Sequence, residues 1–374
     1  MRMLIAGGGT GGHLFPGIAL AEEFSTRHPV NAVLFVGTRR GLEARAVPAA
    51  GFSLQTISAR GLKGKRVGSF LVGLLLLPWS FIESWRILNS FRPDVVVGVG
   101  GYASGPVVLT AWLRRIPTAI QEQNALPGFT NRVLGHFVQA VFISFEESRA
   151  AFPAAKTHLV GNPVRRKLLD NYLRSKSAHD RFEVLVLGGS QGAHGLNMRV
   201  LESLGYLTDL RDAVDFVHQS GTADLPLARA AYAGGGFRAE VVAFIEDMSA
   251  AYARASLVVC RAGAGTVAEL AICKKASVLV PFPGATDDHQ AVNARALVAA
   301  GAAVMYRESE LTGPVLANAI RELYQQPERL QRMAREAGLL GRPEAARELS
   351  DVCVQLVERA RGRAARRPSE APGK

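Results

Sequence analysis

Short apolar runs alternate with longer amphipathic stretches along the chain of 374 residues. Each run is apolar at consecutive positions, which is typical of parallel strands buried on both faces. Between the runs, apolar residues recur at helical spacing, as in 17–28 and 291–301. This alternation predicts α/β domains with doubly wound parallel sheets. The predicted strands are 3–7, 31–37, 95–100, 117–121 and 140–144, then 183–189, 214–219, 240–245, 256–260 and 277–282.

The two series of strands follow one plan. Segments 4–13 and 185–194 each combine a strand, a glycine turn and a histidine at the same offset. We therefore expect two Rossmann-like domains joined near Pro163, and a last helix that crosses back onto the first domain. The expected limits are 1–163 and 164–341 for the domains, 342–361 for the last helix and 362–374 for a basic, disordered tail.

Four glycine-rich turns follow predicted strands, at 7–13, 98–105, 188–194 and 261–266. Ligands of open parallel sheets bind beyond the carboxyl ends of the strands. A glycine turn there lets the backbone approach a phosphate, and the next helix presents N–H groups and the positive end of its dipole. One such turn can simply join a strand to a helix. Four of them indicate a nucleotide or phosphate ligand.

The first turn also satisfies the dinucleotide pattern GxGxxG, through Gly7, Gly9 and Gly12. An NAD enzyme would carry an acidic residue about 20 positions further on, at the end of the second strand. That strand ends instead in GTRRG, where Arg39 and Arg40 would suit the 2′-phosphate of NADP. An NADP oxidoreductase is therefore one alternative, although it does not explain the matching turns in the second half.

Two residues beside these turns could carry chemistry. His13 begins a predicted helix, where a positive charge is disfavoured, so it could act as a general base or orient a hydroxyl. It could equally be hydrogen-bonded within the turn. Glu269 lies three residues after Thr266, a spacing that indicates a capping box; the alternative is a carboxylate that accepts ribose hydroxyls.

Further polar residues have two interpretations each. Asn124 is a loop former or a ligand contact, and Arg165 is a surface charge or a phosphate contact. The stretch 286–294 is a helix cap or a site for sugar hydroxyls. The sequence has no HExxH, no acidic-x-acidic motif after a predicted strand and no cysteine cluster, so we expect no catalytic metal. Helix dipoles and backbone N–H groups would instead stabilise a charged leaving group.

The formal net charge is +12, which favours an anionic partner: nucleic acid, an anionic membrane or a phosphorylated substrate. No recognised nucleic-acid motif is present, so we expect no nucleic-acid partner. The three cysteines, Cys260, Cys273 and Cys353, form no paired framework, which favours a reducing compartment. The chain starts directly with a strand and a glycine turn, so no signal peptide is expected.

Residues 60–88 place basic side chains beside large apolar ones. The apolar stretch 67–82 is interrupted by Ser69, Pro78 and Ser80, whereas a membrane-spanning helix needs about 20 apolar residues. The segment is therefore expected to lie on an anionic membrane surface, or else to be a core helix with a basic entry loop. The expected membrane patch comprises Lys65, Arg66, Phe70, Leu71, Leu74, Leu75, Trp79 and Trp85.

Taken together, the motifs resemble those of the lipid-linked N-acetylglucosaminyltransferases of peptidoglycan synthesis, in glycosyltransferase family 28. The matching segments are GGGTGGHLFPGIALAEE (7–23), VVVGVGGYASGP (95–106), QEQNALPGFTNR (121–132), VGNPVR (160–165), LGGSQGAHGLN (187–197), FIEDM (244–248), RAGAGTVAEL (261–270) and DDHQAVNA (287–294). They span about three quarters of the chain in the same order, which makes them far more specific than any single turn.

The resemblance implies a GT-B fold, with two Rossmann-like domains facing a cleft. It implies an inverting, metal-independent transfer from UDP-GlcNAc to undecaprenyl-pyrophosphoryl-MurNAc-peptide (lipid I), giving lipid II and UDP. The enzyme would be peripheral at the cytoplasmic face of the inner membrane, among cell-wall synthesis proteins that serve cell shape and division. A UDP-GlcNAc 2-epimerase of the same fold would also fit these motifs, and so would a non-enzymatic scaffold at the membrane.

The resemblance also implies roles for individual residues. His13 would be the base at the acceptor, and the family's membrane patch matches 60–88. Contacts to UDP-GlcNAc would come from Thr10, Gly11, Gly12, Asn124, Arg165, Ser190, Ile245, Glu269 and Gln290, with Gly263, Ala264, Gly265, Thr266 and His289 as further candidates. The loops for the acceptor pyrophosphate would include Gly9, Gly100, Gly101 and Tyr102.

Overall fold

The computed structural model describes residues 1–39, 41–59, 67–174, 181–189 and 192–365, without the side chains of 67–76, 173–174, 286 and 364–365. The chain divides into two compact units. The first contains residues 1–123 and 127–165 and the segment from 344 onwards, and the second contains 124–126 and 166–343. The expected limits of 163 and 341 each lie two residues before these boundaries.

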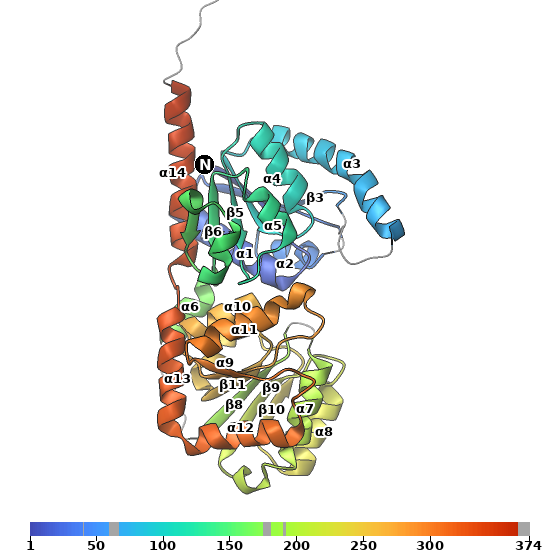
Figure 1. Cartoon of the computed structure of the whole chain (residues 1–374), viewed down its shortest axis with the longest axis vertical. Helices are drawn as coiled ribbons and strands as arrows, with labels where there is room; N and C mark the ends of the chain where they lie inside the picture. Colours follow the sequence, from blue (N-terminus) through green and yellow to red (C-terminus); the bar gives the residue numbers. More distant parts are fainter. Residues whose placement is uncertain (40, 60–66, 175–180, 190–191, 366–374) are drawn as a thin grey trace, which may run out of the picture. The chain divides into compact units, whose positions relative to one another are not determined.

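The first unit is built on a parallel sheet that has seven strands within the described ranges, in the order β3-β2-β1-β4-β5-β6-β7 (Figure 1). The strands are β1 (Arg2–Gly7), β2 (Ala32–Gly37), β3 (Ser53–Thr56), β4 (Val95–Gly100), β5 (Thr118–Glu122), β6 (Ala140–Ile143) and β7 (Thr157–Leu159). The helices are α1 (Gly11–Arg27), α2 (Glu43–Ala49), α3 (Val67–Phe91), α4 (Ser104–Leu113), α5 (Phe129–Leu134) and α14 (Ala345–Ala365), with 3-10 turns η1 (Glu146–Ala151) and η2 (Ala154–Lys156).

Both faces of this sheet are buried. Along β1, Met3 and Ile5 enter one apolar layer, whereas Leu4 and Ala6 enter the layer on the opposite face. Successive side chains of a strand point to opposite faces, so a sheet covered on both sides requires consecutive apolar residues. This requirement explains the unbroken apolar runs of the sequence.

Helix α14 is part of the core of the first unit. Its side chains Leu349, Cys353 and Val357 are spaced four residues apart and enter the same apolar layer as Met3 and Ile5. Arg27 at the end of α1 pairs with Asp351 and donates to the Arg347 carbonyl at 3.0 Å. The helix continues to Ala365, so the predicted start of a tail at 362 is wrong. Arg363, Ala364 and Ala365 are good helix formers and extend the helix.

The second unit contains another parallel sheet, with six strands in the part of the chain that is described, in the order β10-β9-β8-β11-β12-β13. The strands are β8 (Phe182–Leu187), β9 (Val214–Gln219), β10 (Ala239–Val242), β11 (Leu257–Cys260), β12 (Ser277–Leu279) and β13 (Ala303–Met305). The helices are α6 (Arg166–Arg174), α7 (His194–Leu204), α8 (Leu225–Gly235), α9 (Met248–Arg254), α10 (Ala264–Ile272), α11 (His289–Ala299), α12 (Gly313–Gln325) and α13 (Pro327–Leu340), with 3-10 turns η3 (Thr208–Leu210) and η4 (Thr286–Asp288).

A buried histidine lies in the middle of this second sheet. The Nε2 atom of His218 on β9 is 3.0 Å from Asn197 Oδ1, and its Nδ1 atom is 3.1 Å from the Tyr232 hydroxyl. The Asn197 amide donates to the Ser220 carbonyl and to Asp224, so its oxygen faces the ring as an acceptor. The Nε2 atom of the ring therefore carries a hydrogen. Burial lowers the pKa of His218 to about 4.

We expect this histidine to make the second unit sensitive to acid. Between an ordinary pKa of 6.5 and the folded-state pKa of about 4, the unfolded chain binds the proton and the folded chain does not. The free energy of unfolding should therefore fall by roughly 3 kcal/mol as the pH drops through this range. Denaturant unfolding at pH 7 and pH 5 should show a smaller loss for His218→Gln than for the unmodified protein. His28→Gln, which removes an exposed histidine, should keep the original loss. Equal losses for all three proteins would contradict the prediction.

Candidate active site

Two glycine turns meet at one edge of the first sheet. Strands β1 and β4 are neighbours, and the Gly8 N–H donates to the Gly100 carbonyl at 3.3 Å. A Cβ atom on Gly101 would lie 2.4 Å from the Gly8 oxygen, and Gly100 and Gly101 both have positive φ. Only glycine permits this approach and this backbone conformation. The predicted turns 7–13 and 98–105 thus form one surface.

His13 stands against this surface. It lies in the first turn of α1, and a Cβ atom on Gly100 would be only 2.8 Å from its Cδ2 atom. Its Nδ1 atom is 3.2 Å from the Thr10 hydroxyl oxygen. When Nδ1 carries the hydrogen and donates to Thr10, Nε2 holds the lone pair and can accept a proton. The arrangement therefore suits a base next to the two glycine turns.

A residue that the sequence analysis missed holds the first turn in place. The Glu43 carboxylate, only 1% exposed, accepts the N–H groups of Gly9 and Thr38, both at 2.8 Å, and the Thr38 hydroxyl at 2.9 Å. Burial alone would raise its pKa, but these hydrogen bonds lower the pKa of Glu43 below its ordinary value. The N–H group of Gly9 is therefore already used within the protein.

Glu43 also bears on the dinucleotide alternative. A Cβ atom on Gly8, Gly37 or Gly41 would lie within 2.6 Å of the Glu43 side chain, so these glycines leave room for it. Glu43 is thus an acidic residue that follows the second strand, three positions after Arg40. Its carboxylate binds the glycine turn, whereas the dinucleotide pattern requires a carboxylate that binds ribose. Arg40 itself lies outside the described residues.

In the second unit, the turn 261–266 leads into α10, which starts at Ala264 with Gly263 as its N-cap residue. Thr266 and Glu269 therefore both lie inside the helix, and the capping-box interpretation is wrong. Glu269 accepts the hydroxyl of Tyr252 at 2.9 Å. Burial raises the pKa of that hydroxyl well above its ordinary value, so it stays protonated and donates to the carboxylate. Tyr252 thereby fixes one oxygen of Glu269.

Asn124 lies next to the same turn. Residues 124–126 belong to the second unit, where the Asn293 side chain on α11 binds them. Its Nδ2 atom is 3.2 Å from both Asn124 Oδ1 and the Ala262 carbonyl, and its Oδ1 atom accepts the Ala125 N–H at 2.9 Å. Asn293 is buried, and the sequence analysis missed it because a single polar residue in a helix does not reveal its partner.

The start of α11 holds another predicted contact. The Oε1 atom of Gln290 accepts the Phe282 N–H at 3.0 Å, so part of this side chain supports the loop after β12. His289 is the first residue of the helix. The N-cap residue, Asp288, makes no side-chain cap bond and pairs with Arg307 at 3.3 Å. The interpretation of this stretch as a side-chain helix cap is therefore wrong for Asp288.

The remaining predicted contacts lie in different places. Arg165 is the last residue of the segment 127–165 in the first unit. Its guanidinium carbon lies 5.3 Å from the centre of the Phe15 ring. Tyr102 is exposed beside the turn after β4. The N–H group of Ile245, in the loop after β10, donates to Gln219. Ser190 lies outside the described residues, so its predicted contact has no observed geometry.

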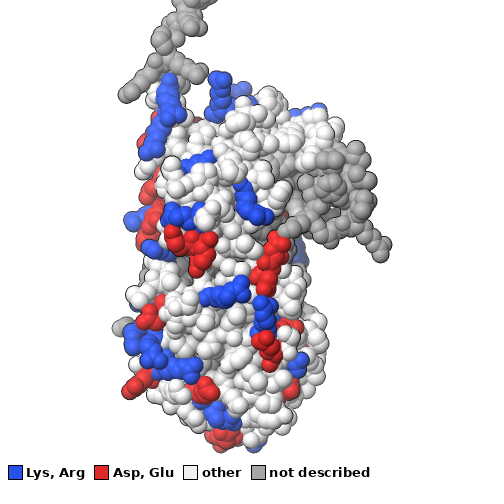
Figure 2. Space-filling view, viewed as in Figure 1, with Lys and Arg blue, Asp and Glu red and all other residues white. Residues whose placement is uncertain are grey.

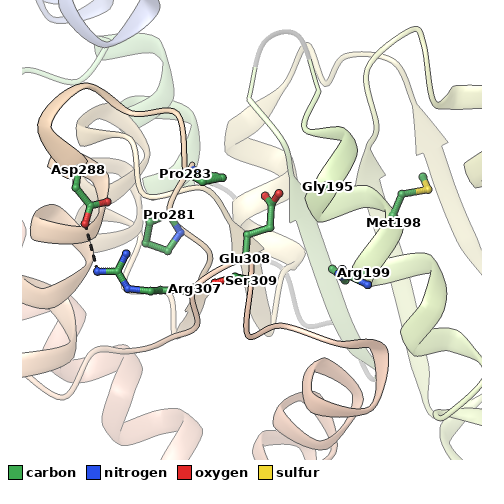
Figure 3. Close-up of a pocket in the computed structure, with 9 residues that line it drawn as sticks. All are labelled: Gly195, Met198, Arg199, Pro281, Pro283, Asp288, Arg307, Glu308 and Ser309. Carbon is green, nitrogen blue, oxygen red and sulfur yellow. Dashed lines mark hydrogen bonds and ion pairs between the residues drawn. The ribbon is translucent and has the colours of Figure 1, made fainter.

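A pocket of about 480 Å³ opens in the second unit between α7 and the loops after β12 and β13 (Figure 3). In Figure 3 the Glu308 carboxylate projects between these elements. It pairs with Arg261, and a Cβ atom on Gly195 would contact it, so it lies against the first turn of α7. None of the predicted nucleotide contacts lines this pocket. Its lining comprises Gly195, Met198, Arg199, Pro281, Pro283, Asp288, Arg307, Glu308 and Ser309.

The predicted membrane patch is described only in part. Trp79 and Trp85 on α3 are 50% and 48% exposed, and arginines lie over both rings: Arg86 at 6.0 Å and Arg114 at 4.8 Å. Figure 2 shows a mostly uncharged surface over α4 and the nearby part of α3. For four further members of the patch, the structure describes the backbone in α3 but not the side chains: Phe70, Leu71, Leu74 and Leu75. Lys65 and Arg66 lie outside the described residues. Among the described residues, none of the helices has both the length and the apolar character of a membrane-spanning segment.

No group of three or more His, Cys, Asp or Glu residues is positioned to bind a metal ion in the part of the chain that the structure covers. The three cysteines, all buried, are unpaired.

Two parallel α/β units with glycine turns at the carboxyl ends of their strands define the GT-B class of nucleotide-sugar enzymes, and the comparisons with known proteins agree. The chain matches the glycosyltransferase family 28 N-terminal domain over residues 3–143 and the C-terminal domain of the same family over 183–349. It belongs to glycosyltransferase family 28. The predicted fold and the prediction of a glycosyltransferase are therefore confirmed, and the oxidoreductase alternative is not supported.

Individual relatives agree with this assignment. The chain is 67% identical to the UDP-N-acetylglucosamine--N-acetylmuramyl-(pentapeptide) pyrophosphoryl-undecaprenol N-acetylglucosamine transferase of Myxococcus xanthus, over 96% of this chain and 93% of the relative. It is 60% identical to the protein of the same name from Anaeromyxobacter sp. strain K, over 100% and 98%. The crystal structure of Acinetobacter baumannii MurG has a TM-score of 0.76 and 31% identity, covering 95% of this chain and 99% of that one. UDP-GlcNAc 2-epimerase from Neisseria meningitidis, at 15% identity and a TM-score of 0.67, shares the fold.

Proposed function

We propose that this enzyme transfers N-acetylglucosamine from UDP-GlcNAc to N-acetylmuramyl-(pentapeptide) pyrophosphoryl-undecaprenol, in peptidoglycan synthesis. The observation that carries this proposal is the identity of 67% and 60%, over almost the whole chain, to transferases named for that reaction. The match covers 96% of this chain with the first of these relatives and 100% with the second, so it includes both units.

The roles of the residues divide between the units. In the first unit, His13 accepts the proton of the acceptor hydroxyl while that oxygen attacks the anomeric carbon, which inverts its configuration. The turn after β4, with Gly100, Gly101 and Tyr102, offers backbone N–H groups to the pyrophosphate of the acceptor. The start of α1, with Thr10, Gly11 and Gly12, offers such groups to the diphosphate of UDP-GlcNAc. Because the N–H group of Gly9 already binds Glu43, Gly9 does not use that group for phosphate.

In the second unit, the starts of α7 and α10 stabilise the negative charge that develops on the departing UDP. Glu269, held by Tyr252, accepts ribose hydroxyls, while Ile245 meets the base through its backbone. Asn124 and Gln290 bind the donor sugar, and Arg165 binds a phosphate. These groups supply the electrostatic stabilisation, so the transfer requires no metal ion.

The exposed tryptophans of α3, each with an arginine over its ring, support peripheral binding to an anionic membrane that carries the polyprenyl acceptor. We place the enzyme at the cytoplasmic face of the inner membrane, where a nucleotide sugar would be available.

The proposal predicts that UDP is released from UDP-GlcNAc only when a lipid I analogue is present, and that the release continues in EDTA. A coupled assay for UDP, run with and without the acceptor analogue, measures this. Conversion of UDP-GlcNAc without any acceptor would instead indicate an epimerase. Loss of UDP release in EDTA would show that a metal ion takes part.

A further inference from the structure

Gln219 is a buried amide between two segments that are expected to bind the nucleotide. It is the last residue of β9 and is 4% exposed. In the sheet, β9 lies between β8 and β10. The glycine turn 188–194 follows β8, and the loop that contains Ile245 follows β10. The carboxyl end of β9 thus lies between the turn for phosphate and the loop for the base.

The side chain of Gln219 binds both segments. Its Nε2 atom donates to the Gly189 carbonyl at 2.8 Å, and its Oε1 atom accepts the Ile245 N–H at 2.9 Å. A reversed amide would place oxygen against oxygen and N–H against N–H, so these contacts fix its orientation. Two opposite hydrogen-bonding roles are therefore filled by a single side chain.

The surroundings of Gln219 hold both ends of this bridge. The Gly189 carbonyl also accepts the Gly192 N–H at 3.1 Å. The next residue along the chain, Ser220, has its carbonyl bound by the buried Asn197 amide at 2.8 Å. A Cβ atom on Gly192 would lie 2.3 Å from that same Ser220 oxygen, so the turn packs directly on the end of β9. The amide therefore extends from a fixed backbone.

We infer that Gln219 is a positioning residue that sets the spacing between the phosphate turn and the base loop, without itself touching the nucleotide. This inference rests on the proposed function, because it takes the ligand to be a uridine diphosphate. In such a ligand the base and the diphosphate are joined by one ribose. The base and the diphosphate can bind at the same time only if the base loop and the phosphate turn are held at the matching distance. This simultaneous binding makes UDP bind more tightly than the base or the diphosphate alone.

The test compares UDP with uridine, which lacks the phosphates. Gln219→Glu keeps an acceptor for Ile245 but sets a carboxylate oxygen against the Gly189 carbonyl, and Gln219→Met removes both hydrogen bonds at similar volume. We expect both variants to weaken UDP binding by about 10- to 100-fold, and Gln219→Glu to weaken uridine binding by less than about 3-fold. Calorimetry measures the Kd of UDP, and competition against UDP measures that of uridine.

A matched control is Gln121→Met, which removes a buried glutamine of the first unit. The Nε2 atom of Gln121 donates to the Ser144 hydroxyl and to the Gly161 carbonyl. This substitution should leave the Kd of UDP unchanged. An unchanged ratio of UDP to uridine affinity in folded Gln219→Glu would overturn the inference. So would a Gln219→Met protein that fails to fold while Gln121→Met folds, because the role would then be purely structural. If the unmodified protein does not bind UDP at all, the proposed function itself fails.

Discussion

Replacing His13 by alanine should lower turnover by about 10²- to 10⁴-fold while leaving the Kd of UDP within about 2-fold, because a general base acts on the transfer step and not on nucleotide binding. His13 stands on the Gly100 turn of the first unit, whereas the groups expected to bind the nucleotide base and ribose lie in the second unit. Acceptor-dependent UDP release measures turnover, and calorimetry with UDP measures binding.

His28→Ala is the matched control for this prediction. It removes a histidine at the opposite end of the same helix, after Arg27, and should leave turnover unchanged. Turnover of His13→Ala close to that of the unmodified enzyme would contradict the role of His13 as a base. A parallel loss of turnover and of UDP affinity would indicate that the histidine binds the donor.

Replacing Glu43 by leucine should lower the free energy of unfolding by about 2–4 kcal/mol. The substitution removes the buried acceptor of three donors, Gly9 N–H, Thr38 N–H and the Thr38 hydroxyl. Released from the carboxylate, the glycine turn should lose its position relative to His13, so turnover should also fall. The Kd of uridine should change little, because Glu269 and Ile245, which are expected to bind its ribose and base, belong to the second unit.

Acid provides an independent check on Glu43. Because the pKa of the folded-state carboxyl lies below its ordinary value, its contribution to stability is present at neutral pH and is lost as the pH falls through the folded-state pKa. Glu43→Gln should lack this part of the acid sensitivity. Denaturant unfolding from pH 7 to pH 3 measures it, with Glu147→Gln, which removes an exposed carboxylate, as the control. Equal stability of Glu43→Leu and the unmodified protein would contradict both predictions.

The sequence predicted the buried strands well and the edge strands poorly. All the predicted strands are present, because a strand covered on both faces must be apolar at successive positions. The strands that the sequence analysis missed, β3, β7 and β13, lie at the edges of the two sheets. In β3, side chains alternate between exposed and half-buried, and each of these strands has at most four residues. Segments this short contain too few positions to show a periodic pattern.

The candidate site shows the same division. Glycine turns are visible in the sequence because the backbone itself requires glycine at Gly100 and Gly101. Their supports are not visible, because Glu43 and Gln219 meet their partners only after distant strands have paired. Thr266 and Glu269 illustrate the opposite error: their spacing matched a cap, but the helix starts at Ala264, with Gly263 as its N-cap residue. Local spacing gives the type of element more reliably than its first residue.

Helix α14 has a consequence for how the chain is made. Synthesis proceeds from the amino terminus, so the strands of the first unit leave the ribosome early, yet Leu349, Cys353 and Val357 are among the last to emerge. Until then, the apolar layer around Met3 and Ile5 lacks part of its cover. The unit that begins first is thus completed last, after the whole stretch 166–343 has been translated. A nascent chain stalled before α14 would carry a complete second unit beside an unfinished first one, and the exposed layer would be a natural binding site for a chaperone.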